Sequence, residues 1–184
     1  MEAVFGSLRE PGPWLALSSG DPCPANVLLS PDGPVLIDFE MAAFRHALLD
    51  AAVLRFPFPN CTPWARLPPA VVARAECAYR ARLPKGLVDD ADAYGRALTP
   101  PLAAWCILRL ARLRRVDVND GAAVRRRTQI IRTVEVFLAT ATAARCLMHL
   151  AAWMECLLGV MRKRWPEASV PAPLYPAFDD LDSH

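Results

Sequence analysis

Lysine is almost absent from this 184-residue sequence, because only Lys85 and Lys163 among its 21 basic residues are lysines. Together with the many alanines and 18 prolines, the excess of arginine is typical of a GC-rich coding sequence. The shortage still limits the chemistry, because no lysine precedes residue 85. A reaction that requires a lysine before residue 85 therefore finds none in this sequence.

A strong net charge is also missing, since 21 basic and 19 acidic residues leave a formal charge of +2. We therefore expect no general attraction to nucleic acid or to a membrane surface. Arginines 125–127 form a local run, but no aromatic residues interleave with them, so a solvated helix face is the favoured interpretation. The apolar share of 54% excludes intrinsic disorder, and the length predicts one domain.

Recognisable metal-binding or disulfide patterns are absent from the six cysteines and three histidines. No two cysteines form a C-x-x-C pair, and the histidines are spread along the whole chain, so no zinc site is predicted. We expect no disulfide framework in a chain with this much core. Four cysteines lie in apolar helical stretches and are expected to be small buried hydrophobes in a reducing compartment. They are Cys77, Cys106, Cys146 and Cys156.

The sequence has neither a leader pattern nor a long uninterrupted apolar run. Its first twenty residues contain no basic region followed by an apolar one, so no signal peptide is predicted. The most apolar window, residues 134–160, is interrupted by charged or titratable residues and is not expected to span a bilayer. These are Glu135, Arg145, His149 and Glu155. We therefore expect a cytoplasmic protein with no membrane partner.

Two short β-type runs, residues 27–29 and 35–37, flank the turn sequence Ser30-Pro31-Asp32-Gly33. Glycine can adopt a positive φ at such a turn, so the pattern predicts a β-hairpin. Another Pro-rich stretch, residues 56–69, predicts an irregular loop.

From residue 69 onward, apolar residues recur at helical spacing and predict several helices. Proline at 68 and 69 marks the first start, and Thr99 is expected to cap a second helix with Pro100 and Pro101 in its first turn. A third helix is expected from Gly121, but residues 139–144 contain no breaker to separate it from a fourth. Acidic residues 89, 90 and 92 suit a helix start, or alternatively a cationic substrate. The fold class is α+β, mainly α.

The polar loop before the hairpin carries the chemistry. Asp21 is followed by Asn26 five residues later, and Asp38 ends the second β-run. Phosphoryl transfer uses one carboxylate to take the proton of an attacking hydroxyl, and an amide and a second carboxylate to hold Mg²⁺. The hairpin should bring both ends of this pattern together. Alone, the Asp21 and Asn26 side chains could simply cap backbone N–H groups of a turn.

Gly20-Asp21-x4-Asn26 with Ile37-Asp38-Phe39-Glu40 resembles the catalytic and metal-binding loops of the aminoglycoside phosphotransferase and choline kinase family. The resemblance implies a protein-kinase-like fold, ATP and Mg²⁺ as cofactors, and a small-molecule hydroxyl as acceptor. It implies Asp21 as the catalytic residue, and Asn26 and Asp38 as ligands of the Mg²⁺ and its nucleotide. Glu40 matches an acidic residue of the family's metal loop and is predicted to be a third metal ligand; alternatively, it is a helix first-turn acid.

The resemblance also divides the chain. Residues 1–13 correspond to the end of a helix and the turn after it, and residues 14–165 to the C-terminal lobe of the kinase-like fold. Within that lobe, residues 14–44 hold the catalytic and metal-binding hairpin and residues 45–165 the helical substrate lobe. The Arg45-His46-x-x-x-Asp50 stretch resembles the helix start after the hairpin. Residues 166–184 are expected to be a mobile, Pro-rich and acidic tail.

Two features depart from the family pattern. Ser19 occupies the position two residues before Asp21 where the family usually has histidine. No Gly-rich turn or lysine precedes the loop, so the ATP-binding lobe is missing from this sequence. We expect the chain to be part of a longer protein, or the lobe to be supplied by another chain. The alternative is a non-catalytic remnant that acts as a binding or scaffolding domain, and its exposed apolar surface would favour homo-oligomers.

Overall fold

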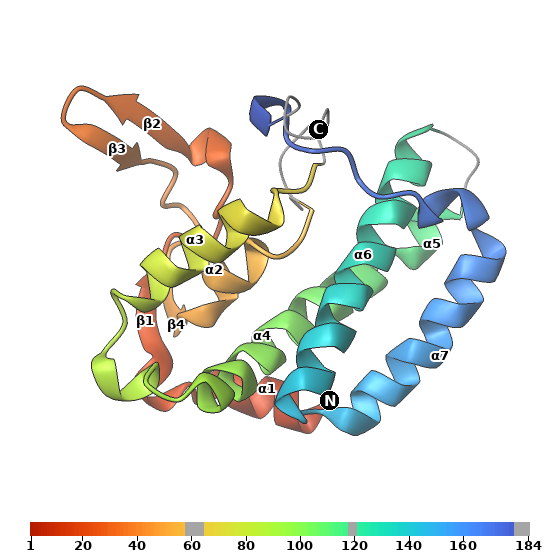
Figure 1. Cartoon of the computed structure of the whole chain (residues 1–184), viewed down its shortest axis with the longest axis horizontal. Coiled ribbons are helices and arrows are strands. Elements are labelled where there is room, and N and C mark those ends of the chain that lie inside the picture. The colour runs from red at the N-terminus through yellow and green to blue at the C-terminus, as the bar shows by residue number, and fades with distance from the viewer. Residues whose placement is uncertain (58–64, 118–120, 179–184) are drawn as a thin grey trace.

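Two small antiparallel sheets lie beside a set of long helices in the computed structural model, which describes residues 1–57, 65–117 and 121–178 (Figure 1). The chain is therefore α+β and mainly helical, as the sequence predicts. In the described part of the chain, no helix is both long enough and apolar enough to cross a membrane.

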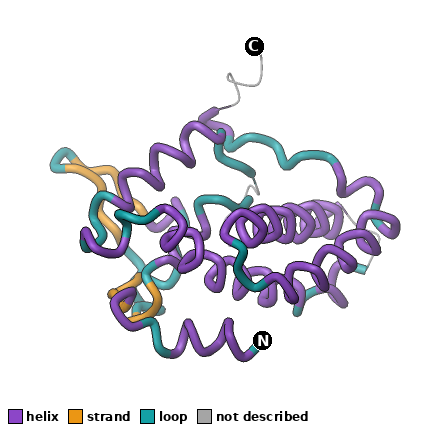
Figure 2. The backbone as a smooth tube through the Cα atoms, turned by 60° about the horizontal axis from the view of Figure 1, so that its bottom comes forward, coloured by secondary structure: helices purple, strands orange, loops and turns teal. Residues whose placement is uncertain are grey.

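The predicted hairpin is confirmed. Strand β2 (Val27–Ser30) pairs antiparallel with β3 (Gly33–Leu36), and Val27 lies opposite Leu36. This hairpin projects away from the helices in two views (Figure 1; Figure 2). Strand β1 (Leu15–Ser18) pairs instead with β4 (Ala43–His46) and forms the second sheet. Helix α1 (Glu2–Arg9) and the single turn η1 (Gly12–Trp14) precede β1.

Strand β4 corrects the expectation that a helix begins at Arg45 and His46. Pairing with β1 keeps these residues extended, and helix α2 (Leu48–Val53) begins only after Ala47. Asp50 therefore lies in the first turn of α2.

The core lies among α4 (Ala91–Leu110), α6 (Gly121–Ala144) and α7 (Met148–Arg164), with α1 and α2 packed against α4. The remaining helical elements are short or peripheral. They are α3 (Pro69–Arg80), η3 (Lys85–Leu87), α5 (Leu113–Val116), η4 (Pro166–Ser169) and η2 (Pro24–Asn26). The buried side chains include Leu98, Leu102, Ile131, Phe137 and Met154.

The predicted start of a helix at Thr99 is wrong, because α4 begins at Ala91 and continues through both prolines. The Asp90 carboxylate caps α4 by accepting from the Asp92 N–H at 2.8 Å, so an acid of the 89–92 cluster serves the helix start. Proline inside a helix removes an N–H and is usually disruptive. Here Thr99, Pro100 and Pro101 are buried, and packing against the core outweighs the local preference.

Helix α6 ends in a common helix-terminating motif, but without the glycine that this motif usually contains. Arg145 has a φ of 50°, its N–H bonds the Thr142 carbonyl, and the Cys146 N–H bonds the Ala141 carbonyl. These bonds form a Schellman motif, which usually places glycine at the left-handed position. The usual sequence signal is missing, so the boundary could not be placed from residues 139–144.

The cysteine expectations need two corrections. Cys106 is buried as predicted, but Cys77 and Cys156 are exposed and Cys146 is half-buried. Cys23 is disulfide-bonded, contrary to the expectation that disulfides are absent. Cys61 lies outside the described residues.

The C-terminal segment is packed rather than loose over residues 166–178. Its Leu174 forms a parallel bridge with Arg66, and Trp165, Ala172 and Leu174 are buried. Parts of this segment therefore pack against the rest of the chain, its mobility stays a prediction, and residues 179–184 lie outside the described residues. Residues 58–64 of the predicted irregular loop also lie outside them.

Candidate functional site

Two loops that carry the candidate residues lie directly against each other. Gly20 has a φ of 85°, and a Cβ built there would overlap the carbonyl oxygen of Met41. Only glycine combines this left-handed backbone with so close an approach. The Gly20 backbone thus places Asp21 beside the loop that contains Asp38 and Glu40.

Asn26 connects Asp21 to the hairpin. Its side-chain Nδ2 donates to the Asp21 carboxylate oxygen Oδ2 and to the Asp21 backbone carbonyl, both at 3.2 Å. Its backbone carbonyl accepts from the Ile37 N–H at 2.9 Å, one residue before Asp38. Asn26 therefore fixes the candidate base, Asp21, next to the end of strand β3. Asp21 and Asn26 are half-buried.

Asp38 adopts a left-handed backbone, with a φ of 63°, directly after the hairpin. A non-glycine residue seldom adopts this conformation, and such strained positions cluster at functional sites. Asp38 and Glu40 are both exposed to solvent. The structure thus places Asn26 in contact with Asp21 and with Ile37, which precedes Asp38, and Glu40 follows two residues later in the same loop.

The donor set suits a hard cation in type but not in number. An amide oxygen from Asn26 and carboxylates from Asp38 and Glu40 are the oxygen ligands that Mg²⁺ prefers, and Mg²⁺ commonly keeps several waters. Among the described residues, however, no group of three or more His, Cys, Asp or Glu side chains is arranged to hold a metal. An ion bound here would therefore have few protein ligands and would keep most of its waters.

Asp50 supports the loop that carries Asp21, a role that the sequence alone did not identify. The Ser18 hydroxyl donates to the Asp50 carboxylate at 2.8 Å and accepts from the Gly20 N–H at 3.0 Å. Burial raises the pKa of the Asp50 carboxyl, and the Ser18 hydrogen bond and the Arg45 charge offset this only in part. Ser18, rather than Ser19, thus ties the loop to α2.

His46 anchors the end of β4. Its ring stacks on Trp14, with ring centroids 5.9 Å apart, and its Nδ1 accepts from the Leu48 N–H at 3.2 Å. An accepting Nδ1 requires a neutral ring, and burial lowers the pKa of His46 to about 4. His46 is therefore a structural support of this region.

Comparison with known protein families found no family model that matches the chain. No curated protein sequence matches it either.

A Gly20→Ala variant tests the close approach of the two loops. We expect it to lower the free energy of unfolding by about 1–3 kcal/mol, because alanine must strain the backbone and displace the Met41 carbonyl. Urea unfolding would measure this. The matched control is Gly86→Ala, since nothing lies within 4 Å of a Cβ at Gly86. Equal stability of the two variants would contradict the packing of these loops.

The neutral state of His46 predicts a pH dependence of stability. Between pH 6.5 and about pH 4 the unfolded chain binds a proton at His46 while the native ring stays neutral, so stability is lost as the pH falls. We expect the stability advantage of wild type over His46→Gln to narrow by roughly 2–3 kcal/mol across this window. Urea unfolding at several pH values measures it.

The control for this experiment is His149→Gln, because His149 is exposed. Its difference from wild type should stay constant over the same pH range. If the His46→Gln difference is equally constant, then His46 is not a neutral buried group.

Proposed function

We propose that this chain is the catalytic and helical lobe of an ATP-dependent phosphotransferase that acts on a small-molecule hydroxyl. Its nearest type is the aminoglycoside phosphotransferase and choline kinase family, with a protein-kinase-like fold. The observation that carries the proposal is the double connection of Asn26, whose side chain bonds Asp21 and whose backbone bonds Ile37 next to Asp38.

Each residue has a role that follows from its chemistry. Asp21 is the base that orients the acceptor hydroxyl and takes its proton, and the Asn26 amide holds one oxygen of this carboxylate in a fixed position. Asn26 and Asp38 would hold Mg²⁺, with Glu40 as an outer carboxylate. When bound, MgATP supplies the phosphoryl group and the metal charge that offsets its negative oxygens.

The proposal includes a partner for the exposed side of the site. No lysine of this sequence lies before the loop to contact ATP phosphates, so we propose that a second, β-rich lobe outside these 184 residues completes the nucleotide site, either in a longer protein or from another chain. Ser19 in place of the family's histidine is consistent with a site whose loop is held differently, through Ser18 and Asp50.

MgATP binding provides the direct test. A ligand that binds only the native state raises its melting temperature, so millimolar MgATP should raise that of this chain. Asp38→Asn should reduce the rise, because one carboxylate ligand of the cation is lost. Differential scanning fluorimetry measures both effects.

The matched control is Asp32→Asn, which changes an exposed aspartate at the hairpin turn. It should keep the full MgATP response. If millimolar MgATP leaves the wild-type melting temperature unchanged, then this chain alone is not an ATP-binding enzyme.

A second candidate function is a non-catalytic binding or self-associating domain, and a specific observation favours it. Both two-stranded sheets and their loops expose large apolar side chains, which we call the apolar face. Isolated two-stranded sheets are only marginally stable in water. The members of the face are Leu15, Leu17, Leu28, Leu29, Val35, Leu36, Ile37, Phe39, Met41 and Phe44.

Several members of the apolar face are strongly exposed, and Leu29 is 89% and Phe44 72% exposed. Because adjacent strand residues point to opposite sides of a sheet, both sides of the β2–β3 hairpin carry exposed apolar side chains. Exposed apolar surface of this kind often marks a site of protein–protein interaction.

Sedimentation velocity tests self-association through this face. If the second candidate is correct, the wild-type chain forms a dimer at micromolar concentration, and a Leu29→Asp, Phe44→Asp double variant is monomeric. The control is Val160→Asp, since Val160 is 61% exposed but lies on α7. A monomeric wild-type chain would contradict self-association and favour a different chain as the partner.

A further inference from the structure

Helix α3 contains no fully buried residue, although it lies alongside the helical body (Figure 1). A helix in a protein usually gains its stability from a buried apolar face. Polar side chains attach α3 to the body instead. Glu76 accepts from Arg55 Nε and Nη2 at 3.1 and 2.6 Å, and the Tyr79 hydroxyl donates to the Ala47 carbonyl at 2.8 Å.

This attachment leaves a groove between α3 and α6. Two adjoining cavities, of about 560 Å³ and 550 Å³, form the groove. Small-molecule sites commonly have volumes of roughly 300–1,000 Å³, so either cavity is large enough. Both cavities are lined by Arg55, Ala73, Glu76, Ala139 and Thr140.

The Arg55–Glu76 ion pair lies between the two cavities, and each side chain is the counterion of the other. Arg55 Nη1 also donates to the Thr140 hydroxyl of α6 at 3.1 Å, so the guanidinium links α3 to α6. The Tyr94 hydroxyl of α4 adds a third donor to the same Glu76 oxygen at 3.3 Å. The charge of Glu76 is thus already balanced and does not call for a cationic ligand.

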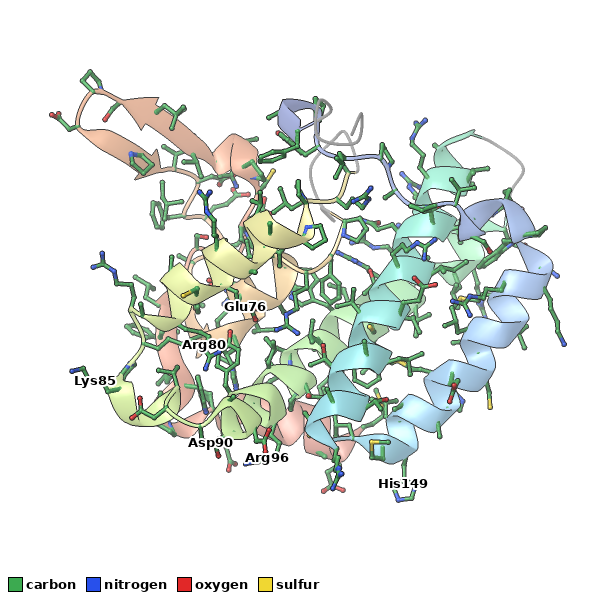
Figure 3. All side chains as sticks on the ribbon, in the orientation of Figure 1. Glu76, Arg80, Lys85, Asp90, Arg96 and His149 are labelled. Atoms are coloured by element: carbon green, nitrogen blue, oxygen red, sulfur yellow. The ribbon has the colours of Figure 1, made fainter. Side chains whose placement is uncertain are left out.

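Arg80 and Asp92 both line the first cavity without a counterion among the described residues. The Arg80 guanidinium lies over the Tyr94 ring, 4.4 Å from the centroid, and Nη2 donates to the Val88 carbonyl at 2.9 Å. Arg80 and Glu76 both project from α3 (Figure 3). Asp92 lines the same cavity, but it is exposed to solvent and forms no ion pair with Arg80 in this part of the chain.

The rest of this cavity, which we call the Arg80 chamber, is open to solvent and mainly apolar. Its lining includes small residues of α4 and α6, among them Ala91, Gly95, Ala143 and Ala144. Asp92 is exposed to solvent whereas Arg80 is half-buried against the Tyr94 ring, so the apolar wall and this guanidinium favour an anionic head on an apolar body.

We propose that the Arg80 chamber binds a small organic carboxylate. The carboxylate accepts hydrogen bonds from Arg80, and the apolar part lies along the alanine-lined wall towards the Arg55–Glu76 pair. Arginine suits this role because its planar guanidinium matches the two carboxylate oxygens. The chamber involves none of Asp21, Asn26 or Asp38.

Three probes with one apolar body and different heads test the ligand class: phenylpropanoate, phenylpropylamine and phenylpropanol. Isothermal titration calorimetry of the full chain should detect phenylpropanoate binding more tightly than the other two. Tighter binding of the amine, or no binding of any probe at millimolar concentration, would overturn the proposal.

Alkylation with iodoacetamide locates the bound probe. Cys77 lines the Arg80 chamber and is exposed, whereas Cys156 is exposed on α7. Phenylpropanoate should slow the labelling of Cys77 and leave that of Cys156 unchanged, as measured by mass spectrometry of the peptides. Equal protection of both thiols, or of neither, would place the probe elsewhere.

Two variants test the specific contacts. Arg80→Gln should raise the Kd of phenylpropanoate about tenfold, equivalent to about 1.4 kcal/mol, and Ala143→Leu should block binding by filling the chamber. The matched control, Arg82→Gln, removes an exposed arginine just beyond α3 and should leave the Kd unchanged. Unchanged binding in a folded Arg80→Gln chain would show that the carboxylate is held without Arg80.

The proposal is separable from the phosphotransferase function. Asp38→Asn should leave phenylpropanoate binding intact, because Asp38 does not line the chamber. Conversely, Arg80→Gln should leave the MgATP response unchanged. Loss of MgATP binding alone therefore refutes only the proposed catalysis, and loss of phenylpropanoate binding alone refutes only the chamber.

Discussion

The hydrogen bonds of Asn26 are the constraint on which the candidate site depends. One side-chain nitrogen and one backbone carbonyl link Asp21, Ile37 and hence Asp38, which are far apart in the sequence. The close approach of the Gly20 backbone to the Met41 carbonyl also keeps these two loops together. A change that moves Asn26 would separate the candidate base from the candidate metal ligand, even though it leaves both side chains in the sequence.

The sequence predicted what short-range patterns determine. The turn at residues 30–33 and its flanking apolar runs predicted the β2–β3 hairpin, which the structure confirms. The start of α3 at Pro69 also agrees. The pattern Asp21, Asn26, Asp38 predicted a shared location, and the bonds of Asn26 place these residues in one region.

Features that depend on contacts between residues distant in the sequence could not be predicted from short patterns. Strand β4 forms because β1 lies beside it, and nothing within residues 43–46 alone indicates that partner. Ser18 and Asp50 become a support for the loop only because α2 returns to it, 32 residues later in the chain. The chamber beside Arg80 likewise depends on three helices, and no short motif marks it.

Pro100, inside α4, and the break between α6 and α7 involve the same carbonyl group, that of Arg96. Pro100 has no N–H to offer the Arg96 carbonyl four residues earlier, and the Cys146 thiol lies 3.8 Å from that oxygen. Cys146 is placed there by the break between α6 and α7. Residues 100 and 146 are therefore coupled through the Arg96 carbonyl. Replacing the proline by a residue with an N–H would restore the helical donor and make the thiol contact redundant.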